Sequence, residues 1–172
     1  MLNIGIVGAG IGGLSAALML KISGHEVTIF EKQSESFSSG VGIQLSSNAI
    51  RILRNFDLED DIIKCGNYPL MVDCINGHNA KKITSIPLGE IARTKFNGGF
   101  YQLHRNDLIS ILKNKANDIG VKINYNSAVV DLLQNLSKAT LMFEKGQFNC
   151  DFVIGADGIN SIVRKKIFFD KP

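Results

Sequence analysis

The feature that most constrains this chain is a glycine-rich turn between a short apolar stretch and a helix-like stretch at its N-terminus. Residues 4–14 read IGIVGAGIGGL. In such a turn Gly8 makes the tight bend, Gly10 lets the backbone approach a pyrophosphate, and Gly13 lets the helix pack closely on the strand. The first helical turn then offers free N–H groups and the positive end of its dipole to phosphate oxygens. The pattern therefore predicts a strand, a turn and a helix that bind a dinucleotide.

An acidic residue follows this motif at the spacing that a dinucleotide-binding unit requires. Glu31 comes directly after the predicted strand 27–30 (VTIF), roughly 20 residues beyond the glycines. A carboxylate at the end of this strand accepts hydrogen bonds from ribose hydroxyls, and it repels a 2′-phosphate. The sequence therefore favours the adenosine of FAD or NAD at this position over that of NADP.

The apolar N-terminus has an alternative interpretation as a membrane span or a secretion signal, because residues 4–22 are mostly apolar. The glycines between Gly5 and Gly13 suit a turn better than a bilayer span, and no basic stretch precedes the apolar run. No other segment approaches the ~18 apolar residues that a transmembrane helix needs. We therefore expect a soluble, cytoplasmic protein with no membrane span.

Composition and the scatter of reactive side chains exclude several classes of function. The net charge is +3 and no basic run is longer than a pair, so nothing indicates a nucleic-acid partner. The cysteines and histidines are widely spaced, which predicts reduced cysteines, no disulfide framework and no metal site. The nucleophile motif GxSxG is absent.

Hydrophobic periodicity beyond Glu31 predicts an α/β chain in which one segment, residues 70–88, departs from the α/β pattern. Strands are expected at 40–45, 70–75, 82–88, 99–104, 121–125, 128–133, 139–143 and 152–156, and helices after Ser46-Ser47, after Asp57, over 105–119 and over 160–169. Ser46, Ser47 and Asp57 are expected to cap the helices that follow them. The continuous apolar run 152–156 is typical of a parallel strand buried on both faces.

Two pairs of the predicted strands are expected to form antiparallel structure. Asn76-Gly77 lies between strands 70–75 and 82–88 and is typical of a hairpin, which would begin a second sheet. Strands 128–133 and 139–143 are expected to form a small antiparallel layer.

Together these segments resemble the class A flavoprotein monooxygenases, the para-hydroxybenzoate hydroxylase-like family, and in particular its salicylate-hydroxylase-like branch. The resemblance rests on GAGIGGLSAA (8–17) with Glu31, GVGIQLSSNAIRIL (40–53), YQLHRNDLISIL (101–112) and DFVIGADGINSIVR (151–164), which follow in the family's order. It implies a Rossmann-like FAD-binding domain, with a parallel sheet flanked by helices, a small antiparallel crossover layer and part of a substrate-domain sheet. The implied domains are 1–69 with 100–172 for FAD, and 70–99 for the partial substrate domain.

The resemblance also implies which residues contact FAD. They are Gly8, Gly10, Ile11, Gly12, Gly13, Arg105 and Asp157 for the pyrophosphate, Glu31, Lys32 and Val129 for the adenosine, Gly42 and Ile43 for the isoalloxazine, Gly158 for the turn after Asp157, and Arg164 for support of that loop or for docking NAD(P)H. Plainer interpretations stay open for some of them: a solvated lysine for Lys32, a salt bridge at a helix start for Arg105, strand core for Val129 and a surface position for Arg164.

By resemblance the chain is part of an NAD(P)H-dependent flavoprotein monooxygenase, an oxidoreductase that uses FAD, NADH or NADPH, and O₂ to hydroxylate a small aromatic substrate. No side chain is identified as a catalytic acid or base. The alternatives are a catalytically inactive FAD- or nucleotide-binding remnant and, from the Rossmann motif alone, an NAD-dependent dehydrogenase domain.

The family's second half carries a Gly-Asp motif, and this chain has no Gly-Asp dipeptide. We therefore expect a truncated chain that lacks the C-terminal half of the family fold, and in which strand 152–156 becomes an exposed apolar edge. Such a chain would bind FAD weakly, or only with a complementing C-terminal chain.

Overall fold

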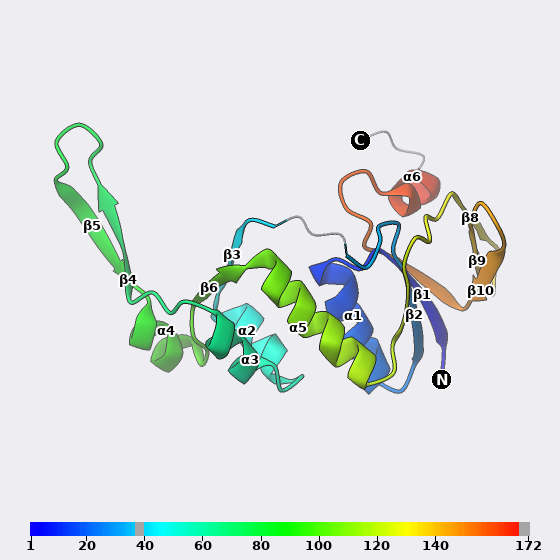
Figure 1. The fold of residues 1–172 in the computed structure, drawn as a ribbon, viewed down its shortest axis with the longest axis horizontal. Helices are drawn as coiled ribbons and strands as arrows, with labels where there is room; N and C mark the ends of the chain where they lie inside the picture. The colour runs from blue at the N-terminus through cyan, green and yellow to red at the C-terminus, as the bar shows by residue number, and fades with distance from the viewer. Residues whose placement is uncertain (37–39, 169–172) are drawn as a thin grey trace. The chain divides into compact units, whose positions relative to one another are not determined.

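The computed structural model describes residues 1–36 and 40–168, which divide into two compact units. The first unit consists of Met1–Ser38 and Leu112–Pro172, and the second consists of Ser39–Ile111. Figure 1 shows the elements of both units as a ribbon. The expected end of the last helix, Phe169, lies outside the described residues.

The first unit is built on a four-stranded parallel sheet with strand order β11-β1-β2-β7. Its strands are β1 (Asn3–Val7), β2 (Glu26–Phe30), β7 (Lys122–Asn124) and β11 (Phe152–Gly155). In the register of the sheet, Ile6 of β1 pairs with Ile29 of β2 and with Ile154 of β11. Ile6 and Ile29 are fully buried, so the sheet forms the core of the unit. The predicted parallel sheet is confirmed.

Helix α1 (Ile11–Ile22) connects β1 to β2 and covers the sheet with one apolar face. Its buried residues Leu14, Ala17 and Leu18 recur at the spacing of one helical face. Helix α5 (Arg105–Asp118) belongs in sequence to both units, and it ends before Gly120, which has φ +80°. The predicted glycine at the end of this helix is therefore confirmed.

A three-stranded antiparallel layer packs against the sheet in the first unit. It consists of β8 (Asp131–Gln134), β9 (Ala139–Met142) and β10 (Gln147–Cys150), in the order β10-β9-β8. The prediction of this layer is confirmed, but it missed β10 and began β8 too early. Leu141 of β9 packs so closely on β1 that a Cβ on Gly5 would lie 3.1 Å from its Cδ1.

Strand β11 is the exposed apolar edge predicted for a chain without the family's second half, and it is not buried on both faces. It pairs only with β1 among the described residues, and its Phe152 is 60% exposed. An edge strand has one flank without a neighbour, so its apolar side chains stay in contact with solvent. Helix α6 (Ile162–Phe168) covers its other end, where a Cβ on Gly155 would lie 2.8 Å from Val163 Cβ.

In the second unit, an antiparallel ribbon of two strands packs with two short helices. The strands are β3 (Gly42–Leu45) and β6 (Tyr101–His104), and the helices are α2 (Ser47–Arg54) and α3 (Glu59–Cys65). The core of this unit contains Leu45, Ile50, Leu53, Phe56, Ile62 and Tyr101.

The predicted caps of α2 and α3 are wrong in detail. Ser46 occupies the N-cap position of α2, but its hydroxyl bonds the Asn48 side chain rather than the helix backbone. Ser47 Oγ instead donates to the Gly98 carbonyl over 2.7 Å, which connects α2 to the segment just before β6. The N-cap residue of α3 is Leu58, and the preceding Asp57 adopts a left-handed conformation with φ 59°. Tertiary contacts and backbone geometry thus override the local capping preferences here.

The excursion predicted over residues 70–88 is present as the hairpin of β4 (Met71–Ile75) and β5 (Lys82–Pro87). Its turn is longer than a two-residue Asn-Gly turn, because the loop closes between the Asn76 N–H and the Lys81 carbonyl, 2.8 Å apart. The prediction also missed helix α4 (Gly89–Phe96), which follows the hairpin and ends at the left-handed Asn97.

Candidate FAD-binding site

A cavity of about 330 Å³ opens in the first unit at the carboxyl ends of β1, β2 and β11. In open parallel sheets, ligands bind outside the carboxyl ends of the strands, at the point where the strand order reverses. Here that point is at β1, because β2 and β11 lie on its two sides. The residues that line it are Val7, Gly8, Gly10, Phe30, Glu31, Lys32, Ser127, Ala128, Val129, Ala156, Asp157, Gly158, Asn160 and Ile162.

Two glycines of the N-terminal turn are required by close backbone contacts. Gly8 has φ +104°, and a Cβ there would lie 2.5 Å from the Ala156 carbonyl oxygen. A Cβ on Gly13 would lie 1.9 Å from the Gly8 carbonyl oxygen. No side chain fits at either position, so the turn can keep this shape only with glycine.

Helix α1 begins at this turn with unsatisfied N–H groups. Gly10 is its N-cap in an extended conformation, and the first helical bond runs from the Leu14 N–H to the Gly10 carbonyl over 2.9 Å. No side chain of the described residues caps the helix. The N–H groups of Ile11, Gly12 and Gly13 therefore have no acceptor inside the helix, which makes this end an anion-binding site.

Glu31 lies beside the mouth of the turn, as the predicted ribose-binding acid must. Its Oε2 accepts a hydrogen bond from the Ala9 N–H over 2.7 Å, and its Oε1 accepts one from the Gln33 N–H over 2.9 Å. Each carboxylate oxygen has two lone pairs, so both can also accept a hydroxyl hydrogen from a ligand. The acid thus fixes the turn and remains able to bind ribose.

The segment after β11 contributes Asp157 and Gly158 to the cavity. Asp157 Oδ1 accepts from Ser161 Oγ over 2.6 Å, and its Oδ2 accepts from the Ile162 N–H over 2.7 Å. Gly158 has φ +80°, which reverses the chain between the strand and α6. The Asp157 carboxylate therefore caps α6 while one side of it faces the cavity.

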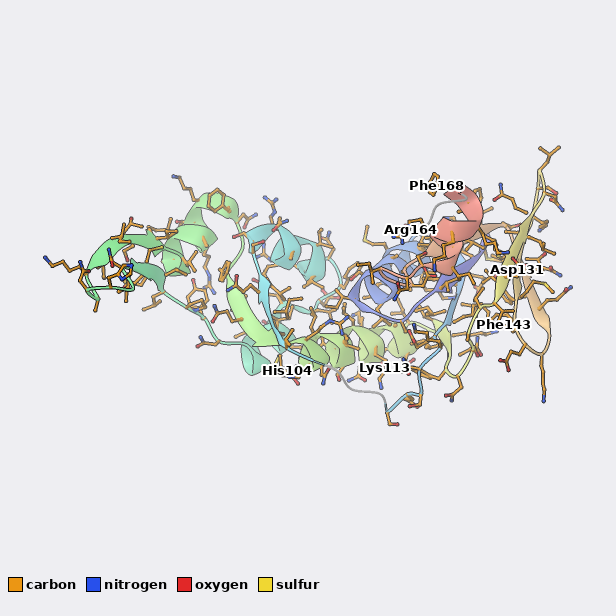
Figure 2. All side chains as sticks on the ribbon, turned by 90° about the horizontal axis from the view of Figure 1, so that it is seen from above. His104, Lys113, Asp131, Phe143, Arg164 and Phe168 are labelled. Carbon is orange, nitrogen blue, oxygen red and sulfur yellow. The ribbon has the colours of Figure 1, made fainter. Side chains whose placement is uncertain are left out.

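Arg164 does not line the cavity but supports the loop that does. Its Nη2 donates to the Ile159 carbonyl over 2.6 Å, and Figure 2 shows it on α6. Of the alternatives weighed for Arg164, this contact favours support of the loop.

Several cavity residues were not predicted. They are Val7, Phe30, Ser127, Ala128, Ala156, Asn160 and Ile162. Most directly precede or follow predicted residues at strand ends, and that position is the signal that could have found them. Ser127 lacks that signal: it lies at the cavity because its N–H donates to the Glu31 carbonyl over 2.8 Å. The ring of Phe30 is backed by Phe143 and Phe148, each at a centroid distance of 4.9 Å.

Three predicted residues belong to the second unit. Gly42 pairs with His104 across the ribbon, Ile43 pairs with Leu103, and the Arg105 N–H donates to the Val41 carbonyl over 3.0 Å. A Cβ on Gly42 would meet no atom within 4 Å, so this glycine leaves open space above the ribbon.

Tyr125 lies near Glu31, and its pKa is raised. Burial raises the pKa of Tyr125, and the negative charges of Glu35 and Glu31 raise it further. Glu35 is paired with Lys113 over 3.3 Å. Within residues 1–36 and 40–168, no cluster of His, Cys, Asp and Glu could hold a metal ion, and no helix is long and apolar enough to cross a membrane.

Residues 1–171 match the sequence family described as the FAD binding domain. The chain belongs to this family. The glycine turn, the uncapped N-terminal end of α1 and the acid at the end of β2 fit an FAD molecule, because they place free N–H groups and a carboxylate at the cavity.

Curated relatives of this FAD-binding domain are aromatic hydroxylases. The chain is 30% identical over 172 residues to 3-amino-4-hydroxybenzoate 2-monooxygenase of Streptomyces cremeus, covering 99% of this chain and 43% of the relative. It is 34% identical over 170 residues to 3-hydroxybenzoate 6-hydroxylase 1 of Aquipseudomonas alcaligenes, covering 98% of this chain and 43% of the relative. The chain thus spans less than half the length of these relatives, and the resemblance to flavoprotein monooxygenases is confirmed.

Solved structures agree with this assignment. The tetrameric form of 2-methyl-3-hydroxypyridine-5-carboxylic acid oxygenase is 30% identical with a TM-score of 0.81, covering 96% of this chain and 42% of that one. The likeness covers the whole described fold, so the predicted α/β FAD-binding architecture is confirmed.

Proposed function

We propose that this chain is the FAD-binding part of an NAD(P)H-dependent monooxygenase that hydroxylates a small aromatic substrate. The observation that carries the proposal is the cavity at the carboxyl ends of β1, β2 and β11, with the Glu31 carboxylate 2.7 Å from the Ala9 N–H. The named aromatic hydroxylases among the relatives support the reaction class.

In this proposal the chain's own groups hold the adenine half of FAD. The N–H groups of Ile11 and Gly12 bind the pyrophosphate at the start of α1, and Gly10 leaves room for it. Glu31 accepts the ribose hydroxyls, while Val129 and Lys32 flank the adenine. Asp157 and Gly158 close the pyrophosphate side.

The remaining proposed contacts concern the flavin end and the reaction. Gly42 and Ile43 flank the isoalloxazine, Arg105 pairs with the phosphates, and Arg164 supports the loop after β11. Bound FAD would supply the redox chemistry, taking electrons from NADH or NADPH and using O₂ for hydroxylation. The chain positions the cofactor and supplies no identified acid or base.

Partners and location are part of the same proposal. Substrate contacts beyond this domain would come from a complementing C-terminal chain or segment, because the relatives extend well past the matched region. Cys65, Cys74 and Cys150 are free thiols, which supports a reducing compartment and hence the cytoplasm.

Reconstitution tests the proposal. The purified chain is mixed with FAD and desalted, and the retained flavin absorbance is measured. NADH and NADPH oxidation is then followed with a hydroxybenzoate, with and without the C-terminal portion of a relative. Retained flavin with substrate-dependent oxidation supports the monooxygenase. Retained flavin without oxidation in any mixture supports a nucleotide-binding chain without turnover.

A further inference from the structure

The second unit contains a phenol, Tyr68, whose hydroxyl group makes no hydrogen bond of ordinary geometry to the described residues. Tyr68 Oη is buried and unpaired among the side-chain nitrogen and oxygen atoms of the described residues. Burial raises the pKa of Tyr68, and the neighbouring Arg93 opposes this rise through its charge and a weak interaction with the hydroxyl that falls short of a well-formed hydrogen bond. Buried polar groups in folded proteins are nearly always paired, so an unpaired one indicates a missing partner.

The backbone on both sides of Tyr68 is fixed by hydrogen bonds. Asn67 exchanges two bonds with Gln102 of β6, at 2.7 and 2.8 Å. The Leu70 carbonyl accepts from the Leu88 N–H over 2.9 Å. Since the segment is held at both ends, the phenol is presented in one orientation rather than by a free loop.

A cation and a second phenol lie against Tyr68. The guanidinium carbon of Arg93 is 5.6 Å from the centre of the Tyr68 ring, and the rings of Tyr68 and Tyr101 are 5.4 Å apart. Arg93 Nη2 donates to Tyr101 Oη over 3.4 Å, a long bond. The nearby Glu59 carboxylate is bound to Arg54, and no carboxylate of the described part of the chain forms an ion pair with Arg93.

This cluster is rich in donors and lacks an acceptor. Arg93 carries five N–H donors, and one of them donates to Tyr101 Oη. Tyr101 Oη already accepts from Arg93, so its own hydrogen is available to donate, as is that of Tyr68. Donors from a guanidinium and two phenols match the oxygen atoms of a carboxylate, which a guanidinium binds through two parallel bonds.

We infer that Arg93, Tyr68 and Tyr101 form a binding site for a small carboxylate. The site goes beyond the proposed function because it lies wholly within the second unit and needs no flavin. Arg93 is exposed on α4, whereas the phenolic oxygens behind it are buried. Because Arg93 lies over the Tyr68 ring, the proposed site requires this exposed side chain to shift so that a carboxylate can meet both the guanidinium and the phenol.

Binding of benzoate to the full chain tests this site, with benzamide as the uncharged match. Affinities are measured by saturation-transfer NMR titration for the wild type, Arg93→Gln, Tyr68→Phe and the control Lys95→Gln, which removes a charge from the same helix. We expect benzamide to bind at least about 10-fold more weakly than benzoate, since hydrogen bonds to charged groups are the stronger ones. Arg93→Gln should weaken benzoate binding at least about 10-fold and Tyr68→Phe about 3-fold or more, with Lys95→Gln within about 2-fold of wild type.

Equal binding of benzoate and benzamide, equal losses in Arg93→Gln and Lys95→Gln, or an unchanged affinity in Tyr68→Phe would each overturn the inference. The last result would mean that solvent pairs with the hydroxyl. Urea unfolding of Tyr68→Phe separates binding from folding, because removing an unpaired hydroxyl should leave stability equal or higher. FAD affinity is measured on the same variants and should not change. Failure of FAD binding alone would count against the proposed function and not against this site.

Discussion

The Glu31 carboxylate accepts a hydrogen bond from the backbone N–H of Ala9, 2.7 Å away, so the acid at the end of β2 holds the glycine turn that follows β1. The two residues are 22 positions apart in sequence. This bond joins two separate elements of the dinucleotide-binding pattern and places a charge at the mouth of the cavity. Glu31 therefore fixes the shape of the turn, and in the proposed function the same carboxylate binds the ribose.

Replacing Glu31 with Gln should weaken both folding and cofactor binding. The amide offers one oxygen where two backbone N–H groups now donate, so one donor would lose its acceptor. We expect unfolding free energy to fall by about 1–2 kcal/mol and FAD affinity to fall about 10-fold. Urea unfolding and a fluorescence titration with FAD measure the two effects. The exposed Glu144→Gln serves as the control, and a Glu31→Gln variant that behaves like it would contradict the assigned role.

Two adjacent glycines of α1 should respond oppositely to alanine. A Cβ at Gly13 would lie 1.9 Å from the Gly8 carbonyl oxygen, whereas a Cβ at Gly12 would meet nothing within 4 Å. Gly13→Ala should therefore destabilise the fold by about 3 kcal/mol or more. Gly12→Ala should keep or raise stability by up to about 1 kcal/mol, because alanine is the better helix former.

FAD binding in Gly12→Ala then reports on the cofactor alone. If the pyrophosphate lies against the Gly12 backbone, as proposed, the new methyl group should lower FAD affinity without lowering stability. Thermal unfolding and FAD titration on the same samples provide the comparison. Unchanged FAD affinity in a stable Gly12→Ala would place the phosphates elsewhere.

The Asp157 carboxylate should contribute mainly to stability, as a cap of helix α6. It accepts from Ser161 Oγ and from the Ile162 N–H, so Asp157→Ala should cost about 1–2 kcal/mol in urea unfolding. Ser161→Ala removes the bond to Asp157 and also the acceptor of the Arg164 N–H at 3.0 Å, so it should cost a similar amount. Exposed Asp118→Ala is the control, and a variant at Asp157 with the stability of that control would show that the cap is unimportant.

Acid should destabilise the first unit through two ion pairs of the antiparallel layer. The pKa of Asp151 is lowered mainly by its hydrogen bond with Lys138, and then by the Asn3 N–H. The pKa of Asp131 is lowered mainly by Lys166 of α6, whose Nζ is 2.8 Å from Asp131 Oδ1; Figure 2 labels Asp131.

A carboxyl group whose pKa is lower in the folded state stabilises the fold when it is ionised. This contribution has its full size above the unfolded-state pKa, about 3.9 for Asp, and it is lost as pH falls through the folded-state pKa. Urea unfolding should therefore be easier at each step below about pH 4, and Asp151→Asn should flatten that dependence. An identical pH profile for Asp151→Asn and wild type would show that this pair does not contribute.

The parts of the fold that were predicted correctly have local causes. The strand, glycine turn and helix of residues 3–22 follow from apolar spacing and from glycines at positions where a side chain collides with backbone. Helix α5 was found for the same reason, with its apolar face and terminal Gly120.

The features that were missed depend on contacts between distant segments. The Ser47 hydroxyl donates to the carbonyl of Gly98, 51 positions away in sequence, and does not cap its own helix. Helix α4 is short and mostly exposed, so its sequence carries a weak apolar pattern. Ser127 reaches the cavity only because its N–H bonds to the Glu31 carbonyl. The glycines, Glu31, Lys32, Val129, Asp157 and Gly158 could be named from the sequence, whereas the other residues of the cavity wall required the folded chain.

The most direct test of the central claim is competition for FAD binding between ADP and its 2′-phosphorylated analogue on the purified chain. The account predicts that ADP displaces FAD, because it carries the pyrophosphate and ribose that the turn and Glu31 recognise. The 2′-phosphate should weaken this competition at least about 10-fold through repulsion by the Glu31 carboxylate. Equal competition by the two nucleotides, or FAD binding that ADP does not affect, would contradict the claim that this cavity holds the adenosine of FAD.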